Sequence, residues 1–202
     1  DVVLFPELSM TGYEPIMAKE LALTPETKVL DEMASLATLH RLSIMAGAPI
    51  KTEKGLCIGA FCFHPQGLHD VVTKQFLHPD ERAFFVEYSL HNGIFFDKEP
   101  LALAICYEIS QPEHIEKAIE HEPVVYAASV AKTAGGVAKA SERLSDIAKE
   151  HSLFALMSNS VGLCEDGYCA GGSAVWGRDG QLLGRLGGEE EGGLLLDPST
   201  GE

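Results

Sequence analysis

The stretch LALAICYEIS, residues 101–110, indicates the fold class most directly. Its first five residues are apolar and read as a buried strand, and the strand gives way at once to helix-start signals. Ser110 and Glu113 fit a capping box, with Pro112 in the first turn. A strand passing directly into a helix is typical of α/β folds, and Cys106 stands at the strand's carboxyl end, where reactive groups collect.

The same reading extends over the rest of the chain. The spacing of apolar residues and the positions of turn-forming residues predict strands at 1–6, 42–50, 101–109, 123–130, 153–162 and 192–197. They predict helices at 24–41, 110–122 and 136–151, and hairpins at 55–77 and 171–187. Thr24 is expected to cap the first helix. Several strands are apolar throughout, so both of their faces should be covered. The pattern predicts an α/β fold with two mixed sheets packed together and helices outside.

Composition restricts the partners. The 202 residues are 46% hydrophobic and 22% charged, as in ordinary globular proteins, and no linker divides them, so one domain, 1–202, is expected. The net charge of −15 argues against nucleic acid or an anionic membrane as a partner. No apolar run is long enough to span a bilayer.

The five cysteines, an odd number at irregular spacing, indicate free thiols in a reducing, cytoplasmic setting rather than a disulfide framework. Cys164 and Cys169 are close enough to pair, but two free thiols near a loop are the favoured interpretation.

Three side chains outside the apolar pattern are candidates for chemistry. Cys106 would need a base or a positive neighbour to act as a nucleophile. Glu7 follows Pro6, where a strand ends, and a carboxylate beside an apolar wall has a raised pKa and can serve as general base and acid. Lys74 could direct an ammonium at an oxygen that gains charge. Each alone has a plainer interpretation: a core cysteine, a loop glutamate and a solvated lysine.

Taken together and in this order, the motifs FPELSMTGY, TKQFLHPDE and AICYEISQPE resemble the carbon–nitrogen hydrolase family, or nitrilase superfamily. LMSNSVG and GGSAVWGRDGQLLG resemble the strand, the Asn-containing turn and the hairpin that follow in that family. The resemblance covers nearly the whole chain. It implies a four-layer α-β-β-α sandwich and a cysteine-dependent hydrolase of non-peptide C–N bonds.

The resemblance also implies residue roles. Catalytic Glu7, Lys74 and Cys106 would be supported by Glu81. We expect Tyr107, Glu108 and Ser129 to contribute to the oxyanion and substrate side. The implied reaction needs no cofactor or metal, takes a small-molecule amide, and belongs to a family that commonly forms homodimers or larger homo-oligomers. Loops at 88–97, 131–136 and 164–172 are expected to shape the pocket.

Two departures separate this chain from the usual family pattern. Ile147 and His151 replace the Arg and Asn of a common Arg-Ala-x-Glu-Asn signature. The family also places a strand and a helix before the Glu motif, whereas Asp1 is the first residue here, so domain 1–202 is expected to lack them. Tyr107, where nitrile hydrolases usually carry Trp, favours an amide or carbamoyl substrate; nitrile hydrolysis and a non-catalytic binding role remain alternatives.

Other classes of protein are less favoured. His114 and His121 share a short segment with Glu113, Glu116 and Glu120, but seven-residue spacing is not a close ligand pair, and a solvated helix face is expected. The chain carries neither a dinucleotide-binding G-x-G-x-x-G nor a P-loop, and no G-x-S-x-G of a serine hydrolase.

Overall fold

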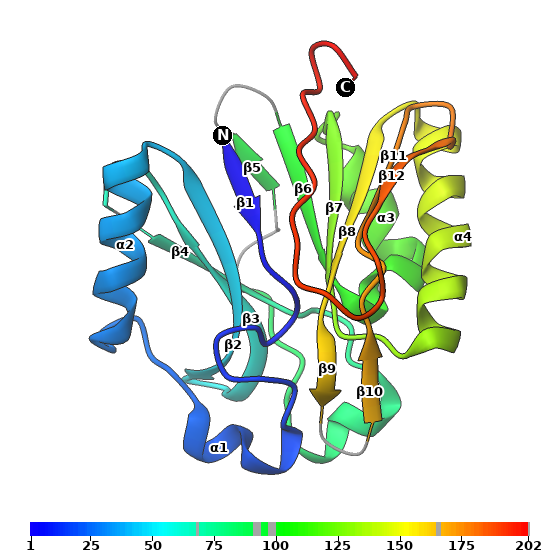
Figure 1. Cartoon of the computed structure of the whole chain (residues 1–202). Coiled ribbons are helices and arrows are strands. Elements are labelled where there is room, and N and C mark those ends of the chain that lie inside the picture. Colours follow the sequence, from blue (N-terminus) through cyan, green and yellow to red (C-terminus); the bar gives the residue numbers. More distant parts are fainter. Residues whose placement is uncertain (68, 91–93, 97–99, 165–166, 202) are drawn as a thin grey trace. The chain divides into compact units, whose positions relative to one another are not determined.

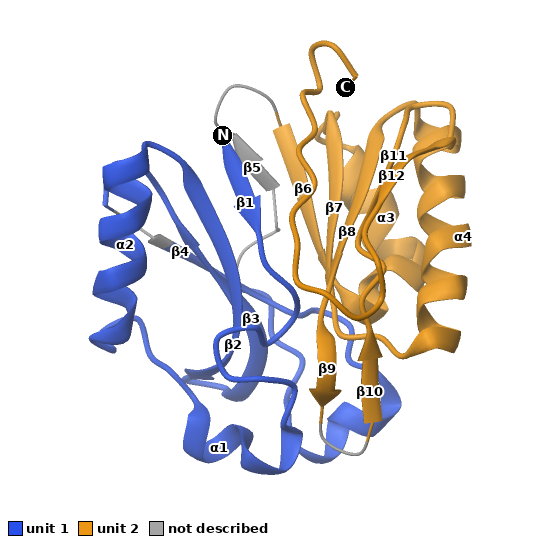
Figure 2. Ribbon diagram, viewed as in Figure 1, with its two compact units in different colours: residues 1–92 blue, residues 93–202 orange. Residues whose placement is uncertain are grey.

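A computed structural model describes residues 1–67, 69–90, 94–96, 100–164 and 167–201 (Figure 1). The chain divides into two compact units, residues 1–92 and 93–202 (Figure 2). Each unit contains one mixed β-sheet with helices, so the prediction of an α/β protein with two mixed sheets is confirmed.

The first unit is built on a four-stranded sheet in the order β1-β2-β3-β4. β1 runs parallel to β2, and the other neighbours are antiparallel. Its elements are β1 (Val2–Leu4), η1 (Pro15–Met17), α1 (Ala18–Leu21), α2 (Val29–His40), β2 (Ser43–Thr52), β3 (Gly55–Phe63), β4 (His69–Thr73) and η2 (Pro79–Ala83).

The two long central strands of this sheet are buried along almost their whole length, as their apolar sequences predict. One core cluster joins them to α2 through Leu30, Ala37, Ile50 and Phe61. The predicted hairpin between β3 and β4 is confirmed, and its turn is closed by the Gly67 N–H donating to the His64 carbonyl.

Two expectations for this unit are wrong in detail. The first strand forms but is not buried: Val2 and Val3 are 40% and 38% exposed, because among the described strands β1 pairs only with β2 and lies at the edge of the sheet. The first long helix begins at Val29 rather than after Thr24. Thr24 instead lies in a separate turn before the helix, in which its carbonyl accepts the Thr27 N–H and its own N–H donates to the Thr27 hydroxyl.

The second unit contains a six-stranded sheet in the order β12-β11-β8-β7-β6-β5 and a small antiparallel pair, β9 and β10. The β6-β7-β8 pairs are parallel and the others antiparallel. Its elements are β5 (Ile94–Phe96), β6 (Pro100–Ile105), η3 (Cys106–Ser110), α3 (Pro112–Ile119), β7 (Val125–Val130), α4 (Ala134–His151), β8 (Phe154–Asn159), β9 (Val161–Cys164), β10 (Gly167–Ala170), β11 (Ala174–Trp176) and β12 (Leu182–Arg185).

The core of this unit lies between the parallel strands and helices α3 and α4. It includes Ile115 of α3, Leu144 and Ile147 of α4, Tyr126 of β7 and Trp176 of β11. The parallel order brings the carboxyl ends of β6, β7 and β8 to one edge of the sheet, and β6 ends immediately before Cys106. The predicted β11–β12 hairpin is confirmed, with its turn at Asp179 and Gly180.

Two predictions fail here. The capping box at Ser110 and Glu113 does not form: the Ser110 hydroxyl donates to the Tyr107 carbonyl, and α3 starts without a side-chain cap. Residues 192–197 are not a strand, and Leu195 is 93% exposed. An apolar sequence suits a strand only where a partner is available for its ladder, and no strand in the described part of the chain pairs with this segment.

Candidate active site

The first unit holds a buried ammonium between two carboxylates. Lys74 Nζ lies 2.8 Å from Glu7 Oε1 and 2.6 Å from Glu81 Oε1. The three residues are 0%, 1% and 2% exposed, respectively. The plainer interpretations of Glu7 and Lys74, as a solvated loop glutamate and a solvated lysine, are therefore wrong, because both side chains are buried. Charges this deeply buried persist only when they are paired and hydrogen-bonded, and this cluster supplies both.

Glu7 is held by a turn that packs closely on β2. The next residue, Leu8, has φ +52°, and the Met10 N–H donates to the Gly47 carbonyl. A Cβ on Gly47 would lie 2.4 Å from the Leu8 nitrogen. Only glycine lets the turn approach the strand so closely, so β2 sets the position of the buried carboxylate.

Lys74 follows β4 directly and is fixed by the sheet itself. Its N–H donates to the Ile58 carbonyl at 2.8 Å, which extends the β3–β4 ladder by one bond. A Cβ on Gly59 would lie 2.4 Å from the Val72 carbonyl oxygen, so this part of the hairpin also depends on a glycine. The long lysine side chain therefore leaves from a rigid backbone.

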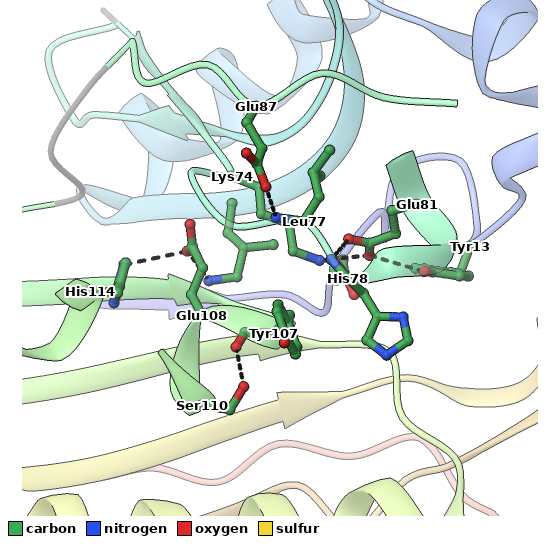
Figure 3. Close-up of polar contacts among 12 residues, drawn as sticks. Tyr13, Lys74, Leu77, His78, Glu81, Glu87, Tyr107, Glu108, Ser110 and His114 are labelled. Atoms are coloured by element: carbon green, nitrogen blue, oxygen red, sulfur yellow. Dashed lines mark hydrogen bonds and ion pairs between the residues drawn. The ribbon is translucent and has the colours of Figure 1, made fainter. Parts of the chain in front are cut away.

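Glu81 lies on the short η2 helix and makes further contacts with its two oxygens (Figure 3). The Tyr13 hydroxyl donates to Oε1 at 3.1 Å, and the His78 N–H donates to Oε2 at 2.7 Å. Sequence reasoning missed both partners. The Tyr13 contact could have been predicted, because Tyr13 belongs to the FPELSMTGY motif. The His78 contact could not, because it is made by a backbone N–H that every residue except proline has.

The second unit presents Cys106 at the end of β6. Cys106 has φ +49°, a left-handed conformation that residues with a Cβ rarely adopt, and its side chain is partly exposed. A strained backbone of this kind persists only where its surroundings hold it. Two contacts do so: Glu108 Oε2 accepts the Ile105 N–H at 2.7 Å, and Arg143 of α4 donates to the Ile109 carbonyl at 3.3 Å.

The Glu108 carboxylate belongs to a buried polar chain. His114 Nε2 lies 3.4 Å from Glu108 Oε2, a contact drawn in Figure 3. His114 Nδ1 lies 3.0 Å from the Tyr126 hydroxyl. Burial lowers the pKa of His114 to about 4, with a smaller contribution from Lys117, and burial raises the pKa of Tyr126 well above its usual value. Both side chains are therefore neutral at pH 7.

This arrangement corrects the expectation of a solvated helix face for residues 113–121. α3 turns His114, Ile115 and Ala118 inward, and His114 is only 4% exposed. Among the residues that the structure describes, no three His, Cys, Asp or Glu side chains gather as a metal site.

Tyr107 and Ser129 are both placed next to the cysteine turn. Tyr107 follows Cys106 in η3 and is partly exposed. Ser129 lies on β7 in register with Ile105 on β6, and it is 2% exposed. Asn159 at the end of β8, within the LMSNSVG motif, receives the Lys132 N–H and donates to the carbonyls of Lys132 and Gly171. It thereby ties the loops after β7 and β10 to the end of β8.

The other thiols have different surroundings. Cys57 and Cys62 are buried, and burial raises the pKa of both. Cys164 and Cys169 are free thiols, as expected, with Sγ atoms 2.8 Å apart across the β9–β10 pair.

The structure describes only part of the three loops that were expected to shape the pocket. Of residues 88–97, positions 91–93 and 97 lie outside the described residues, as do 165 and 166 of residues 164–172. Residues 131–136 are described in full, and only 131–133 form a loop, because α4 begins at Ala134. No helix in the described ranges is both long and apolar enough to cross a membrane.

Comparison with known proteins identifies the family. The profile of the carbon–nitrogen hydrolases matches residues 1–197, whereas no curated protein matches the chain. A mutant of an amidase from Nesterenkonia, of the nitrilase superfamily, superposes with a TM-score of 0.80 at 23% identity, over 93% of this chain and 74% of the amidase. A superfamily protein from Xanthomonas campestris with an arsenic adduct in its active site gives 0.85 at 18% identity, over 95% and 75% of the two chains.

A third structure, from Saccharomyces cerevisiae and of branch 10 of the superfamily, gives a TM-score of 0.84 at 14% identity, over 95% of this chain and 74% of the yeast protein. At these identities the structural matches show the shared fold. The family profile covers almost the entire sequence, and the chain therefore belongs to the carbon–nitrogen hydrolase family, the nitrilase superfamily.

Proposed function

We propose that this protein hydrolyses a C–N bond of a small amide or carbamoyl compound, with Cys106 as nucleophile, Glu7 as general base and acid, and Lys74 as oxyanion donor. One observation above all supports this assignment. The Lys74 ammonium is fully buried and lies between the Glu7 and Glu81 carboxylates. Burying these charges costs desolvation free energy that their mutual attraction offsets only in part, so a functional role accounts for the cluster better than a stabilising one.

The proposed reaction begins with transfer of the Cys106 thiol proton to Glu7. The thiolate sulfur then attacks the carbonyl carbon, and the oxygen gains the negative charge. The Lys74 ammonium and the Tyr107 N–H stabilise this oxyanion; the loss of one such donor typically costs about 3–4 kcal/mol of transition-state stabilisation. As the C–N bond breaks, Glu7 gives its proton to the departing nitrogen, and a thioester remains on the sulfur.

Water completes the cycle. Glu7 accepts a proton from the water, the oxygen attacks the thioester carbon, and the C–S bond breaks to release the acid. The sulfur then regains its proton from Glu7. In this scheme the Glu7 carboxylate makes every proton transfer. Such a role requires a fixed position, and a rigid turn provides it better than a mobile loop would.

Glu81 has an orienting role in this scheme. Its Oε1 accepts from both the Lys74 ammonium and the Tyr13 hydroxyl, and its Oε2 accepts the His78 N–H. A carboxylate with its oxygens engaged in this way restrains the ammonium in one direction.

The substrate class is supported by the related structures. The Nesterenkonia amidase has been solved in complex with butyramide and with acrylamide added to its active-site cysteine. Tyr107, in place of the Trp of nitrile hydrolases, also favours an amide or carbamoyl substrate. We further propose that the chain acts as one α-β-β-α domain and as a homodimer.

An ammonia-release assay over small amides, carbamoyl compounds and nitriles tests the proposal. The expected result is turnover of amides or carbamoyl compounds, loss of turnover in Cys106→Ala with an unchanged circular dichroism spectrum, and little change in Cys57→Ala, which removes another thiol, on β3. Turnover of Cys106→Ala at the wild-type rate, or nitriles as the preferred substrates, would contradict it.

A further inference from the structure

A buried chain of polar groups connects strand β7 to the cysteine turn. It runs from the Tyr126 hydroxyl to His114 Nδ1 at 3.0 Å, from His114 Nε2 to Glu108 Oε2 at 3.4 Å, and from Glu108 Oε2 to the Ile105 N–H at 2.7 Å. Tyr126, Glu108 and His114 are 0%, 2% and 4% exposed. The last link is the backbone amide that directly precedes Cys106.

The protons in this chain have one consistent order. Tyr126 keeps its hydroxyl proton, since burial raises its pKa, and a neutral His114 carries a single ring N–H. Tyr126 therefore donates to Nδ1, and the single ring N–H of His114 lies on Nε2, the nitrogen that is 3.4 Å from Glu108 Oε2. Glu108 in turn accepts the Ile105 N–H. The Tyr126 hydroxyl and the His114 ring thus both direct their donors toward Glu108, and the Ile105 N–H donates to Glu108 from the side of the cysteine turn.

Restraint of the backbone matters most at the Ile105 end of this series of polar groups. Cys106 has a left-handed backbone, with φ +49°, that its neighbours must maintain. The His114 ring lies 3.4 Å from the same Glu108 oxygen that accepts the Ile105 N–H, and it therefore helps to restrain that carboxylate. Glu108 thus links a strained residue to a core strand.

We propose that His114 and Tyr126 are positioning residues, which act through Glu108 to hold the Cys106 turn in the conformation that presents the thiol for attack. This inference rests on the proposed function for its catalytic consequence. Its structural part, the restraint of the Ile105–Cys106 backbone, does not depend on that function.

The experiment compares His114→Leu, His114→Gln and Tyr126→Phe with the wild type. Leucine removes both bonds of the ring, and phenylalanine removes only the hydroxyl. Glutamine keeps one donor and one acceptor near the positions of the ring nitrogens. Ile147→Val, a buried change in the same core cluster, is the matched control for lost packing.

The first readout is the hydrogen-exchange rate of the Ile105 amide, measured residue by residue. His114→Leu and Tyr126→Phe should accelerate it at least about tenfold relative to Ile147→Val, and His114→Gln should restore most of the protection. The control amide is that of Phe154, which donates to the Val124 carbonyl and should be unaffected.

The second readout is the alkylation rate of Cys106 by iodoacetamide, with kcat and KM for the best substrate. His114→Leu should lower kcat about 10- to 100-fold with KM little changed, because the thiol is misplaced rather than the substrate lost. His114→Gln should recover most of that loss.

The outcomes separate the two proposals. Unchanged Ile105 exchange in His114→Leu, or equal effects in Ile147→Val, would overturn the positioning role even if the enzyme is an amidase. Failure of every C–N substrate, combined with faster Ile105 exchange in His114→Leu and recovery in His114→Gln, would overturn the proposed function and leave the restraint in place.

Discussion

Acid should destabilise the second unit through one residue, His114. The pKa of this imidazole falls from 6.5 to about 4 because the ring is buried and Lys117 lies nearby. The unfolded chain takes up a proton near pH 6.5, whereas the folded chain does so only near pH 4. Between these values the unfolded state binds more protons, so stability is full above pH 6.5 and falls as the pH decreases.

The size of this effect follows from the two pKa values. At pH 7.5 the contribution of His114 is close to zero. At pH 5.0 it reaches about 2 kcal/mol against folding, by proton linkage. The groups facing the ring are Glu108, Tyr126 and Lys117, and of these the Lys117 charge opposes protonation in the folded state.

Urea unfolding followed by tryptophan fluorescence measures this effect in the relevant unit. Trp176 is the single tryptophan, is 3% exposed, and shares a core cluster with Tyr126. The loss of unfolding free energy between pH 7.5 and 5.0 should be about 2 kcal/mol smaller in His114→Gln than in the wild type. His121→Gln, an exposed change just beyond the same helix, should leave the loss unchanged. Equal losses in the wild type and His114→Gln would refute the reasoning.

Three further predictions concern other parts of the chain. Lys74→Met should lower the unfolding free energy by about 3–5 kcal/mol in urea titrations, because two buried carboxylates lose their counter-charge; a change below about 1 kcal/mol would contradict it. Gly47→Ala should lower kcat by displacing the turn that carries the buried carboxylate, whereas Gly193→Ala, with no atom within 4 Å of the added carbon, should not; equal kcat values would count against the close-approach argument. Glutathione disulfide should oxidise Cys164 and Cys169 to one disulfide, with loss of two thiols in a denatured-state titration that Cys164→Ser prevents; five remaining thiols would disprove it.

Local patterns were sufficient for most of the secondary structure. The apolar runs at 42–50 and 123–130 and the hairpin turns at Gly67 and Gly180 were predicted and are present. The strand predicted at 101–109 is present only as far as Ile105, and Cys106–Ser110 form a short helix instead. They could be predicted because burial of both strand faces and the backbone demands of tight turns select residue types over a few neighbouring positions.

Three of the failures have one physical cause, which is that they depend on partners distant in sequence. Residues 192–197 have the composition of a strand, but no strand in the described ranges pairs with them, and in the same ranges β1 has a neighbouring strand on one side only and is exposed. The inward placement of His114 was also missed, since its partner Tyr126 comes from a different element.

By itself, the sequence determined the α/β class, the family motifs and the three residue types of the candidate site. It could do so because these features depend on the types and spacing of residues that are close together in the sequence. Only the tertiary structure decided that Lys74 is buried between Glu7 and Glu81 and that Glu108 faces His114. Glu7 and Lys74 are separated by 67 positions, and their contact depends on how β1 to β4 are ordered in the sheet, which residue spacing does not encode.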